Sequence, residues 1–182
     1  MSDSPWYGTI DEGKPLVQGE VIHSCPILIP KTDSDLTKTD KNVKIIIRRY
    51  NVIIMSQSCD LRHDKLDNVL VCPLHEIGKA VKKFPHLKSR KESEALERGY
   101  LPAYHLLNEC EISGSERDYS IVTFRDVYGV PLNILKKSIQ GQQRVELLPP
   151  YKEHLSQAFA RFFMRVGLPV DIKGFQERLQ DM

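Results

Sequence analysis

The string Ser-Gln-Ser-Cys-Asp-Leu at residues 56–61 holds side chains whose types and spacing are suited to chemistry. It follows the apolar run Val52–Met55, which we expect to form a buried strand, and loops at strand ends are common places for functional sites. We therefore take Cys59, Asp60 and Arg62 as candidate residues for an interaction or a ligand. The alternative is structural, because Ser and Asp side chains at a strand end also bond nearby backbone amides.

Metal binding is a second candidate chemistry. Cys59 and His63 are four positions apart and Cys72 and His75 are three apart, so two turns could each present a thiolate and an imidazole. Zinc takes four such ligands in a tetrahedron. The pattern predicts a zinc site made by these four residues. The alternative is that these thiols and imidazoles are unrelated and that the protein has no cofactor.

A third candidate chemistry acts on RNA. Arg48, Arg49 and His63 combine two guanidinium groups with an imidazole, which together can stabilise phosphate charge and transfer protons. They are the catalytic candidates if the protein is a ribonuclease, and Tyr50 beside them could stack on a base. The alternative is that the two arginines protect the edge of a strand from aggregation.

The composition is that of an ordinary globular chain. It has 182 residues, of which 41% are apolar and 27% charged, and its formal net charge is +2. That length suits one domain with a substantial core. The near balance of charge argues against a strongly electrostatic nucleic-acid or membrane-surface protein.

The ends and the apolar runs of the sequence favour a cytoplasmic protein. Residues 1–15 lack the apolar segment of a signal peptide. The longest apolar runs, Val52–Met55 and Val69–Cys72, are much shorter than the about 20 residues of a membrane helix. We therefore expect reduced thiols at the four cysteines and no contact with a membrane.

The elements needed to position these residues predict a single α+β domain. The β-branched runs 43–50 and 52–56 predict neighbouring strands joined by a turn at Asn51. Pro73 is expected to end the pairing of the next strand. We expect a small SH3-like or related antiparallel β-barrel, divided into an irregular arm (1–15), the barrel (16–148) with a helical insertion near 75–98, a closing helix (151–166) and a tail (171–182).

The closing helix has the clearest pattern. Five apolar residues recur on one face of residues 151–166, with charged residues largely elsewhere, and Gly167 follows where a helix often ends. The face should pack on the sheet; its members are Leu155, Phe159, Phe162, Phe163 and Val166. In contrast, residues 31–42 are polar and predict an exposed, mobile loop that could dock a partner.

The segment Gln18-Gly19-Glu20-Val21, a long polar loop and the strands 52–56 and 69–74 together resemble the opening of the MazF/PemK-type toxins. The resemblance covers roughly residues 16–78. It implies an SH3-like barrel that cleaves RNA and acts as a dimer with an antitoxin. The loop here has neither proline nor glycine, and no proline follows Arg48 and Arg49, so the catalytic basic residue of that family has no counterpart.

The strings at 56–61 and 155–169 also resemble uncharacterised bacterial proteins, which implies no activity. Because no catalytic set is complete, the sequence favours a non-catalytic protein-interaction or accessory module of a bacterial defence or toxin–antitoxin system. A MazF/PemK-like endoribonuclease acting on RNA is the alternative, and a zinc-binding regulatory protein is the second alternative. The sequence leaves the oligomeric state open.

Overall fold

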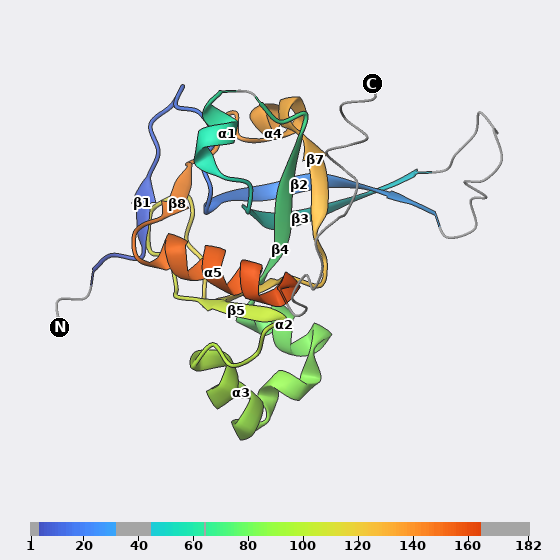
Figure 1. The fold of residues 1–182 in the computed structure, drawn as a ribbon, viewed down its shortest axis with the longest axis vertical. Helices are drawn as coiled ribbons and strands as arrows, with labels where there is room; N and C mark the ends of the chain where they lie inside the picture. Colours follow the sequence, from blue (N-terminus) through green and yellow to red (C-terminus); the bar gives the residue numbers. More distant parts are fainter. Residues whose placement is uncertain (1–3, 32–44, 64, 165–182) are drawn as a thin grey trace, which may run out of the picture.

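An antiparallel sheet organises the chain in the computed structural model, which describes residues 4–31, 45–63 and 65–164 (Figure 1). The described strands follow the spatial order β1-β8-β2-β3-β4-β6-β5, and β7 pairs with β4 beside this path. The mixture of sheet and helices agrees with the predicted α+β class. The strands are β1 (Tyr7–Thr9), β2 (Glu20–Pro30), β3 (Ile45–Ile54), β4 (Asn68–Glu76), β5 (Tyr104–Leu107), β6 (Ser120–Thr123), β7 (Tyr128–Pro131) and β8 (Val145–Leu147).

The sheet is open along this path. β1 and β5 stand at its two ends, and none of the described strands joins them. Closure into the expected SH3-like barrel is therefore not seen in the described part of the chain. Residues 1–15 were expected to be an irregular arm, but the arm contains β1, which pairs with β8 between Tyr7 and Leu147.

The expected turn at Asn51 is wrong, because β3 runs unbroken from Ile45 to Ile54. Asn51 pairs with Leu74 of β4 inside this strand. Its side-chain Oδ1 accepts a hydrogen bond of 3.0 Å from the backbone N–H of Ser24. Ser24 has a φ of 51° at a bulge in β2. The side chain of Asn51 thus stabilises the bulge in β2, and β3 continues through Asn51 without a turn.

The expectation that Pro73 ends a strand is also wrong. β4 continues to Glu76, and Pro73 lies opposite Val52 of β3. In an antiparallel ladder, alternate residues turn their N–H groups away from a given neighbour. A proline at such a position removes no hydrogen bond to that neighbour.

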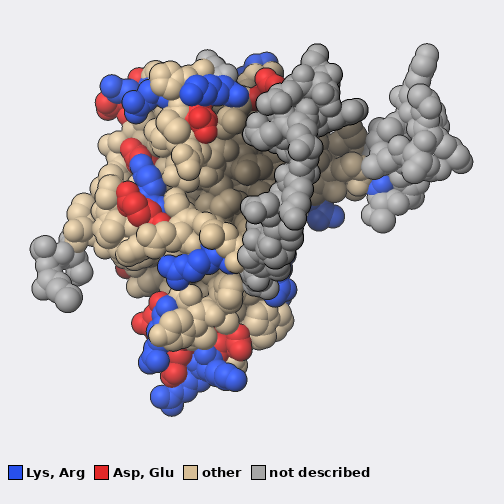
Figure 2. All heavy atoms as spheres, viewed as in Figure 1, with Lys and Arg blue, Asp and Glu red and all other residues tan. Residues whose placement is uncertain are grey.

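The helical insertion is present and begins slightly later than expected. It consists of α2 (Ile77–Lys83), a short 3₁₀ helix (Pro85–Lys88) and α3 (Arg90–Glu97). The Oγ of Ser89 caps α3 by accepting a hydrogen bond of 3.3 Å from the N–H of Glu92. Figure 2 shows basic and acidic side chains interspersed over the insertion, at the bottom of the view. Such a mixture is typical of a solvated surface.

The closing helix α5 (Tyr151–Phe163) lies across the sheet (Figure 1). Leu155 is fully buried. The rings of Phe159 and Phe162 lie 5.5 and 6.1 Å from the ring of Phe124, which directly follows β6. The expected burial of Phe163 is wrong, because 58% of it is exposed. Val166, the tail 171–182 and the loop 32–42 lie outside the described residues.

The other described helices are α1 (Ser58–Arg62) and α4 (Leu132–Ser138). α1 follows β3, and α4 packs its buried Leu135 into the apolar cluster beneath β2 and β3. None of the helices in the described ranges combines the length and the apolar character that crossing a membrane requires.

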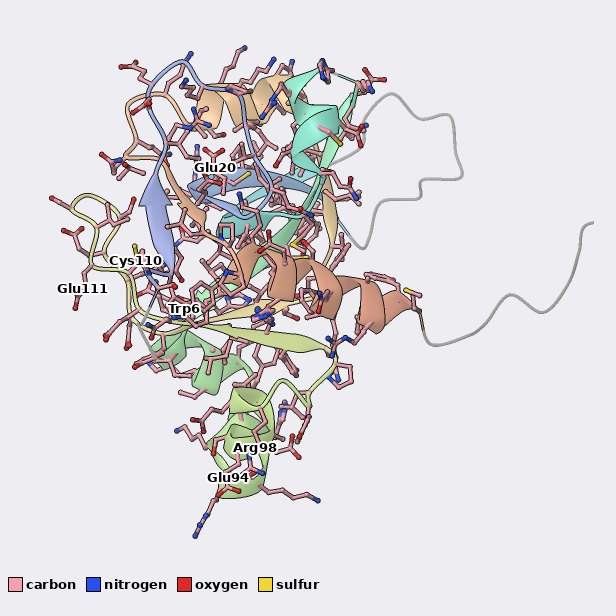
Figure 3. The ribbon with its side chains drawn as sticks, turned by 60° about the vertical axis from the view of Figure 1, so that its left-hand side comes forward. Trp6, Glu20, Glu94, Arg98, Cys110 and Glu111 are labelled. Carbon is pink, nitrogen blue, oxygen red and sulfur yellow. The ribbon has the colours of Figure 1, made fainter. Side chains whose placement is uncertain are left out.

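A buried ion pair between Arg144 and Glu20, the latter labelled in Figure 3, ties the amino-terminal loop to the sheet. Arg144 Nε donates to Glu20 Oε1 at 2.7 Å, and Arg144 Nη2 donates to Glu20 Oε2 at 2.9 Å. The same guanidinium also donates to the carbonyl oxygens of Lys14 and Pro15, at 2.6 and 3.0 Å. Glu20 in turn accepts from the N–H of Val17 at 3.2 Å. Each side-chain nitrogen of Arg144 and each carboxylate oxygen of Glu20 therefore has a hydrogen-bond partner.

We expect Glu20→Gln to destabilise the fold strongly, because it leaves the buried guanidinium of Arg144 without its counter-charge. Breaking a buried ion pair costs about 3–5 kcal/mol, and the free energy of unfolding should fall by that amount. Urea denaturation followed by circular dichroism measures the change.

The exposed pair of Arg90 and Glu94 in α3 provides a matched control. Its Nε–Oε1 distance is 2.8 Å, yet the arginine side chain is 93% exposed. Surface ion pairs contribute little, so Arg90→Ala should leave the unfolding midpoint nearly unchanged. Equal effects of the two substitutions would show that the Glu20–Arg144 pair does not stabilise the sheet.

Candidate functional site

The string at 56–61 is held by its own serines. Ser56 Oγ accepts a hydrogen bond of 2.9 Å from the N–H of Leu70, and Ser58 Oγ accepts one of 3.0 Å from the N–H of Gln18. Gln18 Nε2 donates to the carbonyl oxygen of Met55 at 2.8 Å. Both serines thus bond backbone amides that are distant in the sequence, and they join β3, β4 and the loop before β2.

The three interaction candidates of this segment lie on the surface of α1. Cys59 and Arg62 are exposed and Asp60 is half-buried. The thiol of Cys59 approaches Gln57 Oε1 at 3.7 Å. The backbone carbonyl of Asp60 accepts from the N–H of Lys65 at 3.1 Å, which closes the turn after the helix. A ligand at this place remains a prediction.

The proposed zinc ligands are not gathered into one site. Cys59 is exposed on α1 and His63 is exposed just after it, whereas Cys72 is fully buried in β4 and His75 lies near the end of that strand. Burial raises the pKa of the Cys72 thiol to about 12, which opposes formation of the thiolate that zinc needs. Within the described ranges, no three Cys, His, Asp or Glu side chains are placed to hold a metal ion.

The catalytic candidates for RNA cleavage are likewise spread apart. Arg48 and Arg49 are consecutive residues of β3, so their side chains point to opposite faces of the strand. His63 follows α1, at the other end of β3. All three side chains are exposed, but a shared phosphate would require them on one surface.

The surface that best suits an interaction is a two-stranded ribbon that extends beyond the rest of the sheet (Figure 1). We call it the β2–β3 ribbon; it pairs Cys25–Pro30 of β2 with Ile45–Tyr50 of β3. Only the later half of β3, Asn51–Ile54, pairs with β4. The ribbon therefore has no described strand on either side.

The two faces of the ribbon differ sharply. One face carries Cys25 and Ile27, which are buried against α4, and Tyr50, whose ring stacks 6.2 Å from that of Tyr128 in β7. The opposite face, which we call the open face, carries the directly opposed pairs Leu28–Ile47 and Pro30–Ile45. Its apolar side chains are largely in solvent, with exposed fractions of 50% for Leu28, 62% for Ile47 and 55% for Ile45.

The prolines of β2 show which edge of the ribbon can accept another strand. Pro26 and Pro30 lack an N–H, so they suit positions that point away from β3. The alternation of an antiparallel ladder then makes their partners, Arg49 and Ile45, point their own backbone groups away from β2. Ile47, midway between Arg49 and Ile45, also points its backbone N–H and C=O groups away from β2. The prolines thus blunt the β2 edge, while β3 offers the N–H and C=O groups of these three residues, which we call the open edge.

The charge of the ribbon is positive. Its described residues 25–30 and 45–50 contain Arg48 and Arg49 and no acidic residue. Arg49 Nη1 donates to the carbonyl oxygen of Ser24 at 3.2 Å, which places its guanidinium beside the bulge of β2. An isoleucine-rich run was expected to be a strand, but its exposure was not foreseen. The prolines at 26 and 30 and the paired arginines were the signals that could have indicated it.

We expect Cys59 to be the cysteine that reacts in the folded protein. It is exposed, whereas Cys25, Cys72 and Cys110 are buried, and burial raises the pKa of the Cys25 thiol to about 11. Thiolates are the reactive form. Brief treatment with iodoacetamide at neutral pH should add one adduct, located at Cys59 by mass spectrometry, and none to Cys59→Ser. Rapid addition of two or more adducts would contradict the burial of the other three.

Neither protein-family models nor curated proteins match the sequence of this chain. The resemblance of residues 16–78 to MazF/PemK-type toxins accordingly stays a prediction. Arguments about function rest on the geometry of the ribbon and of the other surfaces.

Proposed function

We propose that this protein is a non-catalytic interaction module that binds an extended segment of a protein partner along the open edge of β3. The observation that carries the proposal is that no described strand pairs with the outward backbone groups of Ile45, Ile47 and Arg49, beside the exposed apolar side chains of Ile45 and Ile47. Addition of a strand to a sheet edge obtains affinity from main-chain hydrogen bonds and specificity from alternate side chains.

The chemistry of the open face defines the segment that would fit. Leu28, Ile45 and Ile47 require apolar side chains at every second position of the partner, since residues i and i+2 of a strand share a face. Arg49, at the sheet-proximal end of the same face, favours a carboxylate beside them. The partner segment is therefore extended, apolar on one face and acidic at one end.

Such a segment is consistent with an accessory role in a bacterial defence or toxin–antitoxin system. We also propose the SH3-like barrel and the dimer that the resemblance to MazF/PemK-type toxins implies. The proposed location is the cytoplasm.

An endoribonuclease is the second candidate, because the exposed guanidinium groups of Arg48 and Arg49 could contact an RNA backbone. Their opposite orientation on β3 and their separation from His63 place this candidate second. A zinc-binding regulatory protein gains no support from the separated positions of Cys59 and Cys72.

We expect Ile47→Lys to weaken capture of the partner by about tenfold or more, because burying an isoleucine contributes about 1.5–3 kcal/mol. The protein is immobilised and incubated with extract from its source cells, and retained proteins are quantified by mass spectrometry. Leu70→Lys is the matched control, since Leu70 is an exposed leucine of β4 outside the ribbon, with an exposed fraction of 43%. A partner that follows the proposal is retained by the wild type and by Leu70→Lys and is depleted with Ile47→Lys.

Hydrogen exchange of the isolated complex locates the contact. The amides of Ile45, Ile47 and Arg49 should become protected, while those of Ile46 and Arg48, which already face β2, should change little. Equal retention by both lysine variants would contradict the proposal. Cleavage of RNA by the wild type and not by Arg48→Ala/Arg49→Ala would favour the ribonuclease instead.

A further inference from the structure

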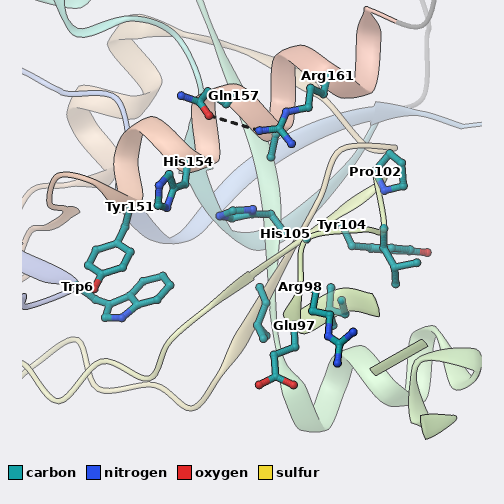
Figure 4. A pocket seen from close by; sticks show the side chains of 15 residues that line it. Trp6, Glu97, Arg98, Pro102, Tyr104, His105, Tyr151, His154, Gln157 and Arg161 are labelled. Atoms are coloured by element: carbon teal, nitrogen blue, oxygen red, sulfur yellow. Dashed lines mark hydrogen bonds between the residues drawn. The ribbon is translucent and has the colours of Figure 1, made fainter. Parts of the chain in front are cut away.

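A pocket of about 550 Å³ opens between α5, β5 and the end of α3, remote from the β2–β3 ribbon (Figure 4). We call it the α5 pocket. Cavities of about 300–1,000 Å³ are the size that holds small organic ligands. Three parts of the chain that are far apart in the sequence meet here: Trp6, residues 96–106 and α5.

Packing fixes the walls of the α5 pocket. The ring of Trp6 stacks on that of Tyr151 at the start of α5, with centroids 3.7 Å apart and planes 11° from parallel. Leu101 and Leu106 contribute aliphatic surface on the opposite side, and Ala158 leaves room at the middle of α5. The interior is therefore suited to an apolar, flat body.

Two arginines carry the positive charge of the pocket lining. Arg161 and His154 stand on the same face of α5, and Arg98 stands on the facing wall (Figure 4). Arg161 Nη2 donates to Gln157 Oε1 at 3.4 Å, a weak bond to a neutral group. Against these groups the lining contains one carboxylate, that of Glu97. The net positive charge of this lining favours an anionic ligand.

His105 occupies the centre of the pocket between the two walls (Figure 4). Burial, together with the neighbouring His154, lowers the pKa of the His105 imidazole to about 4. The ring is therefore neutral at physiological pH and offers one donor and one acceptor nitrogen. An anion bound beside it would favour its protonated form and raise its pKa.

We propose that the α5 pocket binds a small aromatic carboxylate, with the ring on the apolar floor and the carboxylate beside Arg161 and His154. Arginine binds carboxylates through paired N–H donors, and Arg161 stands on the same face of α5 as His154 (Figure 4). This site is separate from the proposed strand addition and does not depend on it.

The test uses 2-naphthoate as the probe and isothermal titration calorimetry as the measurement. 2-Naphthalenemethanol supplies the same ring without the charge, and acetate supplies the charge without the ring. We expect naphthoate to bind at least tenfold more tightly than the neutral analogue and acetate not to bind measurably. Naphthoate binding no tighter than the alcohol, or absent at millimolar concentration, would overturn the proposal.

Variants of exposed arginines distinguish naphthoate binding in the α5 pocket from adventitious binding elsewhere on the surface. Arg161→Gln should weaken naphthoate by up to about fivefold, since an exposed ion pair contributes up to about 1 kcal/mol, and should leave the alcohol unaffected. Arg90→Gln, on the outer face of α3, is the matched control and should bind as the wild type does. Unchanged naphthoate affinity in Arg161→Gln would overturn the assignment.

A nuclear magnetic resonance titration of the two histidines gives a readout that does not depend on affinity. In the free protein His105 should titrate near pH 4, and saturating naphthoate should move its midpoint upward by a measurable amount. Ala158→Phe fills the pocket and should abolish both the binding and the shift while retaining the spectrum of a folded protein. A midpoint of His105 that does not respond to naphthoate would place the ligand elsewhere.

Discussion

The buried pair of Glu20 and Arg144 is the constraint on which the rest of this fold depends. A carboxylate and a guanidinium enclosed in an apolar interior are tolerable only when nearly every donor and acceptor is used. Here the pair fixes β2 relative to the segment before β8, and the guanidinium also binds the loop at Lys14 and Pro15. That loop carries the chain from β1 to β2, so both strands that flank β8 are positioned by one group.

Local signals in the sequence predicted the elements whose boundaries are set locally. The spacing of Leu155, Phe159 and Phe162 identified α5 and its buried face, because a helical period is read within one or two turns. Phe163 continues the same stripe, yet it is exposed. Where a helix stops covering a sheet depends on the extent of the sheet, which no local pattern contains.

Asn51 and Pro73 illustrate the converse, since both are signals that usually interrupt a strand. Each nevertheless lies inside a continuous strand. The side chain of Asn51 bonds the bulge of the neighbouring β2, and Pro73 occupies a position of the ladder that needs no N–H. The residues predicted to bind zinc or to cleave RNA lie apart for a related reason. Neighbours in sequence such as Arg48 and Arg49 diverge across a strand, whereas His105 and His154 approach each other from separate elements.

The unequal edges of the β2–β3 ribbon also set a limit on assembly. A sheet with two receptive edges can grow from both sides into a polymer, but here Pro26 and Pro30 close one side. The stoichiometry at the ribbon is thereby restricted to one added strand for each molecule. Even if that strand came from the β3 of another copy, both receptive edges would be consumed, and the product would be a closed pair and not a fibre.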